Sequence, residues 1–190
     1  MQENLIAHIR KFIPLTDEEA GKICGRTREK ICTKKEILLK EGARCQEMYF
    51  IADGCLRLYV MNDNGSEQTI QFGIENWWLS DFTILGTSER SGFCIQAVER
   101  TEILVLSVAD QEFLLHSVPR LERYFRIIMQ KAYAASLMRF HYLFDMSGEE
   151  RYRHFSNAFP GFVQKVPQYM LASYLGFTPE FLSKIRAKKK

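Results

Sequence analysis

The feature that most constrains this chain lies near its carboxyl end, in the stretch VPQYMLASYLGFTPEFLSKIR. Apolar residues recur there at helical spacing on both sides of Gly176, a residue suited to the left-handed conformation that ends a helix. Thr178 is a favourable N-cap, and Pro179 fits the first helical position because no N–H is needed there. Leu182 and Ile185 give the second helix one buried face. The pattern predicts two short helices joined by a tight turn.

On its alanine, glycine and apolar positions, this stretch resembles the helix-turn-helix of the Crp/Fnr superfamily of bacterial transcription regulators. Ala172 is small enough for the two helices to cross closely, as a helix-turn-helix requires. If the second helix enters the major groove, its N-terminal residues face base edges. Glu180 can then accept a hydrogen bond from cytosine, and Lys184 can reach guanine or a phosphate. The alternative is a helical hairpin that packs on the chain's own core, which the basic character of the exposed residues disfavours.

The residues predicted to contact DNA are the exposed positions of the second helix and the basic end of the chain: Thr178, Pro179, Glu180, Ser183, Lys184, Arg186, Lys188, Lys189 and Lys190. Few residues follow the second helix, whereas a winged module would add a β-hairpin, so we expect the wing to be truncated or missing. Phosphate contacts then fall to the basic residues, which set affinity and salt dependence but no sequence preference.

The charge of the chain is divided unevenly. Residues 1–146 hold 18 Lys/Arg and 20 Asp/Glu, whereas residues 147–190 hold 8 Lys/Arg and 3 Asp/Glu. A mildly acidic body with a basic end is typical of a nucleic-acid-binding appendage, although a solubilising tail has the same signature. The sequence has no run of eighteen apolar residues and a polar, charged start. We therefore expect no membrane partner and a cytoplasmic location.

The middle of the chain has the pattern of an antiparallel β-structure. Between residues 36 and 106, short apolar runs alternate with turn signals such as Asp53-Gly54 and Asn64-Gly65, which is typical of a sandwich or jelly roll. We predict an α+β fold in three parts: a β-roll sensor domain of the cyclic-nucleotide-binding type with N-terminal helices (1–116), a dimerisation helix (117–146) and a helix-turn-helix domain (147–190).

The long helix expected from Pro119 to about Phe144 has apolar residues on two faces. One set forms a heptad-like seam: Leu121, Phe125, Ile128, Ala132 and Ala135. Another set lies off that seam: Ile127, Met129, Tyr133 and Met138. A helix that must bury two faces suits a position between its own β-roll and a second copy of the chain. The resemblance implies such a dimerisation helix, and a monomer with a fully covered helix is the alternative.

The resemblance also implies an effector pocket in the β-roll. In the family, a glycine–glutamate pair binds ribose and an arginine–serine pair binds the cyclic phosphate, so Arg90 and Ser91 are the candidate phosphate ligands. Ser80 stands where the family has its glutamate, with Asp81 beside it. Ser136 falls where the long helix faces the effector. Because the ribose-binding glutamate is missing, we disfavour a cyclic nucleotide, assign no cofactor, and predict a degenerate pocket or one for another effector.

No enzyme and no metal site are predicted. The four histidines, which a metal-dependent jelly-roll enzyme would place on its strands, lie outside them: His8, His116, His141 and His154. The five cysteines lack C-x-x-C spacing, so we expect reduced thiols and no iron–sulfur cluster. The sequence thus predicts a dimeric regulator whose partners are double-stranded DNA, a second copy and RNA polymerase. The alternative is a cyclic-nucleotide- or small-effector-binding module that acts on a protein.

Overall fold

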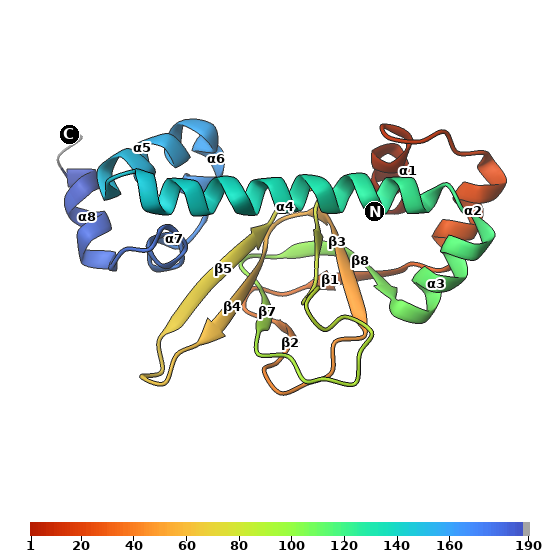
Figure 1. Ribbon diagram of the computed structural model, residues 1–190, viewed down its shortest axis with the longest axis horizontal. Coiled ribbons are helices and arrows are strands. Elements are labelled where there is room, and N and C mark those ends of the chain that lie inside the picture. The colour runs from red at the N-terminus through yellow and green to blue at the C-terminus, as the bar shows by residue number, and fades with distance from the viewer. Residues whose placement is uncertain (188–190) are drawn as a thin grey trace.

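The computed structural model describes residues 1–187, and its elements are arranged along one long helix (Figure 1). This helix, α4 (Leu121–Asp145), runs over the β-strands from the N-terminal helices to the C-terminal helices. Helices α1 (Gln2–Arg10), α2 (Asp17–Gly25) and α3 (Val108–Ser117) lie at one end. The predicted contacts of Lys188, Lys189 and Lys190 lie outside the described residues.

The strands form two four-stranded antiparallel sheets, with orders β1-β8-β3-β6 and β2-β7-β4-β5, which confirms the predicted α+β fold with a β-roll. Their bounds are β1 (Arg28–Cys32), β2 (Ile37–Leu39), β3 (Glu47–Asp53), β4 (Leu56–Met61), β5 (Glu67–Gly73), β6 (Trp78–Leu79), β7 (Cys94–Ala97) and β8 (Thr101–Ser107). The sequence did not predict β1, which is mostly charged and exposed, or β6, which is two residues long. Both are strands because of their partners: β1 pairs with β8, and β6 pairs with β3.

The two sheets enclose an apolar core. Its fully buried members come from both sheets and include Ile51, Leu56, Leu79, Ile95 and Ile103. The turn between β3 and β4 requires glycine, because Gly54 has a φ of +92° and a Cβ there would lie 2.8 Å from the carbonyl oxygen of Arg100. The predicted Asp53-Gly54 turn therefore joins two strands that lie in different sheets.

A second core lies where α1 packs beneath α4, and it contains a buried polar chain. Trp78 Nε1 donates to the Tyr124 hydroxyl at 2.9 Å, and that hydroxyl lies 3.0 Å from His8 Nδ1. Burial is the main reason that the pKa of His8 falls to about 4, and Lys11 and Lys131 lower it further. This chain ties the first helix, the β-roll and the long helix together.

The C-terminal helices are α5 (Gly148–Ala158), α6 (Pro160–Lys165), α7 (Gln168–Leu175) and α8 (Pro179–Ala187). A capping box formed by Ser147 and Glu150 begins α5. Pro160 begins α6, in which it occupies the first position. A third core joins these helices to the β-roll through Phe72 on β5 and Val98 after β7.

The two apolar faces of α4 have different surroundings. Residues of the predicted seam face the chain's own β-roll: Leu121 is buried, Phe125 and Ile128 pack on the core below, and Ala135 lines cavities beside the β-roll. A different stripe is exposed, at the spacing of a coiled-coil seam: Tyr133, Leu137, Phe140 and Phe144, the last of which is 89% exposed. The apolar face of α4 that stays exposed is therefore this stripe, whereas the predicted seam is covered by the chain's own β-roll.

Candidate DNA-binding surface and ligand cavities

Helices α7 and α8 have the geometry of a helix-turn-helix. Gly176 has a φ of +75° and ends α7 in the left-handed conformation. The Thr178 hydroxyl then accepts a 3.3 Å hydrogen bond from the Phe181 N–H and caps α8. Ala172 is fully buried where the two helices meet, and Leu182 and Ile185 point into the same core. The local pattern of residues alone accounts for this arrangement.

The remaining face of α8 is exposed to solvent. It contains the described residues that were predicted to contact DNA: Thr178, Pro179, Glu180, Ser183, Lys184 and Arg186. Hydrogen bonds from backbone N–H and from Thr178 at the helix start lower the pKa of Glu180, so its carboxylate is an acceptor at neutral pH. Neither Ser183 nor Lys184 is turned into the core. The arrangement exposes an acceptor and two cations on a single helix.

Helix α7 is hydrogen-bonded to β5 at the edge of the β-roll. The Ser173 hydroxyl accepts a 2.8 Å hydrogen bond from the Thr69 N–H and donates one of 3.0 Å to the Glu67 carbonyl oxygen. Arg139 on α4 donates to the carbonyl oxygens of Ile70 and Tyr174, which belong to β5 and α7. These contacts set the orientation of the helix-turn-helix relative to the β-roll and the long helix.

The candidate effector residues of the β-roll already have hydrogen-bond partners within the chain. Ser91 is buried and donates a 2.7 Å hydrogen bond to Oδ2 of Asp81, which is also buried. The Ser80 hydroxyl donates to the Glu47 carbonyl oxygen at 2.8 Å. Arg90 is exposed and donates to the Gly42 carbonyl oxygen at 2.7 Å. A phosphate beside Ser91 would therefore meet the Asp81 carboxylate, which repels it.

Ser136 is not brought together with these residues. It lies on α4, where its hydroxyl donates to Ala132, whereas Arg90 and Ser91 lie in the segment between β6 and β7 (Figure 1). The sequence-predicted effector residues thus occupy two separate places.

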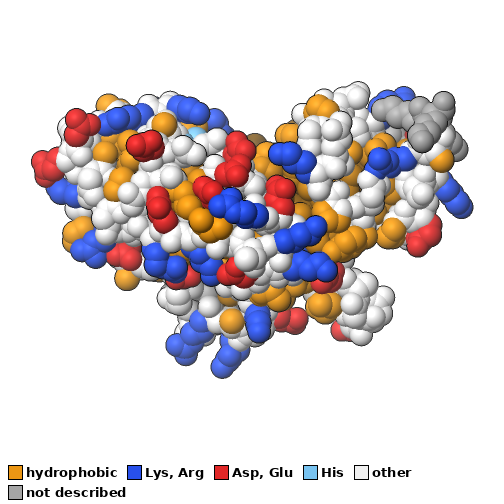
Figure 2. All heavy atoms as spheres, turned by 180° about the vertical axis from the view of Figure 1, so that it is seen from behind, with side chains coloured by type: hydrophobic (Ala, Val, Ile, Leu, Met, Phe, Trp, Pro, Cys, Tyr) orange, Lys and Arg blue, Asp and Glu red, His pale blue; other side chains and the backbone are white. Residues whose placement is uncertain are grey.

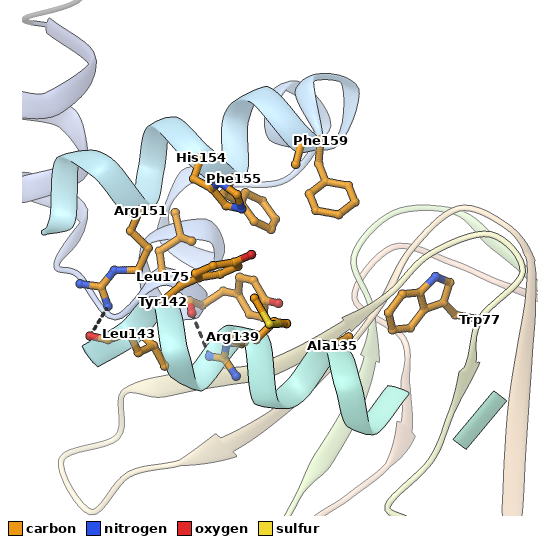
Figure 3. Close-up of a pocket in the computed structure, with 13 residues that line it drawn as sticks. Trp77, Ala135, Arg139, Tyr142, Leu143, Arg151, His154, Phe155, Phe159 and Leu175 are labelled. Carbon is orange, nitrogen blue, oxygen red and sulfur yellow. Dashed lines mark hydrogen bonds between the residues drawn. The ribbon is translucent and has the colours of Figure 1, made fainter. Parts of the chain in front are cut away.

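Four cavities lie instead around one tryptophan, Trp77, and three of them are also lined by α4. Neither Arg90 nor Ser91 lines any of these four. The largest, which we call the junction cavity, has a volume of about 350 Å³ and lies between α4, α5, α7 and Trp77 (Figure 3). Trp77 is held in place because its carbonyl oxygen accepts from the Ile51 N–H at 2.9 Å, next to Asn76 with its φ of +67°.

Sequence reasoning missed Ser173 and Arg139 as positioning or cavity residues, and it did not place Trp77 beside the C-terminal helices. For Arg139 a signal existed, because this cation interrupts the apolar seam of the long helix. A charged residue on an otherwise apolar helix face needs a polar partner, and the structure supplies one on β5. Ser173 and Trp77 gave no comparable signal.

A metal site, a membrane-spanning helix and a reactive thiol each require particular features of the described residues. Within residues 1–187, no three His, Cys, Asp or Glu side chains are gathered as a metal site would need, and no helix has the length and apolar character to cross a bilayer. The five cysteines are free, four of them buried, and burial raises the pKa of Cys24, Cys32 and Cys55. Raised pKa values keep these thiols protonated and poorly nucleophilic.

Comparison with known proteins identifies the fold. Residues 29–117 match the family model of the cyclic nucleotide-binding domain. FixK2 from Bradyrhizobium japonicum is similar in structure with a TM-score of 0.73 and 15% identity, over 85% of this chain and 83% of that one. The c-di-GMP-responsive global regulator CLP from Xanthomonas campestris has a TM-score of 0.72 and 11% identity, over 92% of this chain and 91% of that one.

A sequence relative is a much longer protein. A Rhodopseudomonas palustris protein that carries a potassium channel name is 26% identical over 120 residues, which are 63% of this chain and 28% of that protein. The chain thus spans about a quarter of that relative's length. The similar solved structures named above are transcription regulators and not enzymes, and their similarity covers most of this chain, extending beyond residues 29–117.

Proposed function

We propose that this chain, whose residues 29–117 form a cyclic nucleotide-binding domain and whose overall fold is that of Crp/Fnr transcription regulators, is a dimeric DNA-binding regulator of that type. Its parts are a sensor (1–116), a dimerisation helix (117–146) and a helix-turn-helix domain (147–190). The observation that carries the proposal is the orientation of α8, which buries Leu182 and Ile185 and exposes Glu180, Lys184 and Arg186 to solvent.

Dimerisation is supported by the exposed stripe of α4. Four large apolar side chains at heptad spacing are costly to leave in water, and a second copy of the same helix is the complementary surface. Figure 2 shows hydrophobic side chains gathered between the C-terminal helices and the rest of the molecule. A dimer with two recognition helices about 34 Å apart would match half-sites one DNA turn apart.

The effector differs from a cyclic nucleotide in this proposal. Ser91, the candidate phosphate donor, is already bonded to Asp81, and Ser80 has no carboxylate with which to hold a ribose. We further propose that the regulator acts on DNA in the cytoplasm and that it contacts RNA polymerase there.

The proposal is tested by a mobility-shift assay with genomic DNA fragments at increasing salt. We expect retention of a subset of fragments, with affinity falling by about 0.9 log units per log unit of salt for each phosphate contact. Enriched fragments should share two half-sites at one-turn spacing. Absence of retention at low salt, together with capture of a protein by the same chain, would favour the alternative module that acts on a protein partner.

A further inference from the structure

We propose that the junction cavity is a binding site for a small aromatic carboxylic acid. Its volume of about 350 Å³ falls at the lower end of the range typical of small-molecule sites, which are apolar and contain a few polar groups. The cavity is separate from the residues Arg90 and Ser91, which do not line it. The existence of this binding site does not depend on the proposed DNA-binding function.

The lining favours a planar ring. Aromatic side chains from the β-roll, α4, α5 and α7 surround one space, including Trp77, Tyr142, Phe159 and Tyr174 (Figure 3). The rings of Phe155 and Phe159 are 5.1 Å apart. Aromatic rings interact best in offset or edge-to-face arrangements at centroid separations of about 4.5–7 Å, so a flat ligand ring between Trp77 and Phe159 would find suitable partners on both sides.

The charges favour an anionic group on that ring. Arg139 and Arg151 line the cavity, whereas no Asp or Glu does. Their guanidinium groups lie at the end away from Trp77 (Figure 3). The bonds of both go to neutral carbonyl oxygens, and in each residue Nε is buried with no hydrogen-bond partner among the described residues. A carboxylate at this end would offset the uncompensated charge.

The same lining disfavours a nucleotide. A ribose carries several hydroxyl groups, and burying them without partners costs free energy. The mainly apolar walls offer few such partners. None of the four residues of the exposed stripe of α4 lines the junction cavity, so a second copy packed on the stripe would leave the cavity free.

The position of the cavity suggests what the ligand does. Its walls belong to the long helix, to α5 and to α7, the first helix of the helix-turn-helix. A ligand that contacts all three would favour one relative placement of these helices. Its effect on DNA affinity rests on the proposed function, whereas binding itself does not. Binding and DNA retention are therefore measured separately.

The test is calorimetric titration of the full chain with 1-naphthoate and with the neutral 1-naphthylmethanol. We expect one site per chain and tighter binding of the naphthoate. Ala158→Phe, which fills the cavity from α5, should weaken naphthoate binding at least about tenfold. Ala7→Phe, an exposed alanine on α1, is the matched control. Arg151→Gln should weaken naphthoate but leave naphthylmethanol unchanged.

Three results would overturn the proposal. Equal naphthoate binding by Ala158→Phe and the native chain would place the ligand elsewhere. Displacement of naphthoate by cyclic AMP at equal concentration would make the cavity a nucleotide site. Loss of the dimer in Ala158→Phe, seen by light scattering, would make the cavity a contact between copies. If naphthoate binds in the cavity while no DNA fragment is retained, the site stands and the proposed function fails.

Discussion

Ser91 donates a 2.7 Å hydrogen bond to the carboxylate of Asp81, and both side chains are buried at the place where a phosphate ligand was expected. The carboxylate also accepts from the Thr83 N–H at 3.1 Å. The buried Asp81 carboxylate already accepts hydrogen bonds from these residues, so no ligand is required to satisfy it. Its negative charge would repel a phosphate. The hydrogen bond between Ser91 and Asp81 therefore occupies the expected effector site. The cavities of the molecule lie elsewhere, around Trp77.

Ser91→Ala is expected to lower the free energy of unfolding by about 1–3 kcal/mol, because Asp81 loses a donor in a buried place. Urea unfolding followed by circular dichroism measures this. Ser88→Ala, in the exposed part of the same loop, serves as the control and should change stability little. The native chain should bind no cyclic AMP, and a saturable cyclic AMP response that Arg90→Ala abolishes would contradict this account.

Glu180→Ala and Lys184→Ala should each reduce the preference for an operator over unrelated DNA by about 1–3 kcal/mol, because Glu180 is exposed in the first turn of α8 and Lys184 is exposed in its last turn, where the proposed docking places them at the DNA. The measurement is competitive binding to operator and non-operator duplexes at fixed salt. Lys165→Ala, on α6, should leave the preference unchanged. Unaltered preference in both α8 variants would argue against this docking.

Leu137→Glu and Phe144→Glu should convert a dimer into a monomer, because each places a charge in an apolar seam that the partner would bury. Light scattering after gel filtration reports the mass, and circular dichroism checks the fold. Ile31→Glu replaces another exposed apolar residue, on β1, and should leave the dimer intact. A mass of two chains in both stripe variants would show that dimerisation uses another surface.

Acid should destabilise the protein through His8. Its pKa is 6.5 in the unfolded chain and about 4 in the folded one, so below pH 6.5 the unfolded state binds more protons. The contribution of His8 to the free energy of unfolding is fully present above pH 6.5, and it falls by on the order of 2 kcal/mol as the pH drops to 4. Thermal unfolding across this range measures the loss. His8→Gln removes the titrating ring, and an equally steep loss in that variant would exclude His8 as the cause.

Ser173→Ala should loosen the C-terminal helices from the β-roll, because the Thr69 N–H and the Glu67 carbonyl oxygen lose their partner. We expect a loss of about 1–2 kcal/mol in stability and faster amide exchange at Thr69. Ser183→Ala, on the exposed face of α8, is the matched control for both readouts. Unchanged exchange at Thr69 would mean that Ser173 does not hold α7 on this edge.

The sequence by itself determined the local features of the chain. The caps at Thr16, Ser147 and Thr178 and the left-handed Gly176 were predictable, because each depends on residues within a few positions. The same holds for the buried and exposed faces of α8. Strand runs with strong apolar character were also predictable, whereas β1 and β6 depend on partners far along the chain.

Only the tertiary structure decided which faces meet. The sequence indicated that α4 has apolar residues on more than one face, but only the packing on the β-roll showed that the face with Leu121 is covered and that a stripe ending at Phe144, which was not predicted from the sequence, is exposed. Ser173 and Thr69 are 104 positions apart, and no local pattern indicates their hydrogen bond. Cavities have the same origin, since they form where side chains of separate elements fail to fill the space between them.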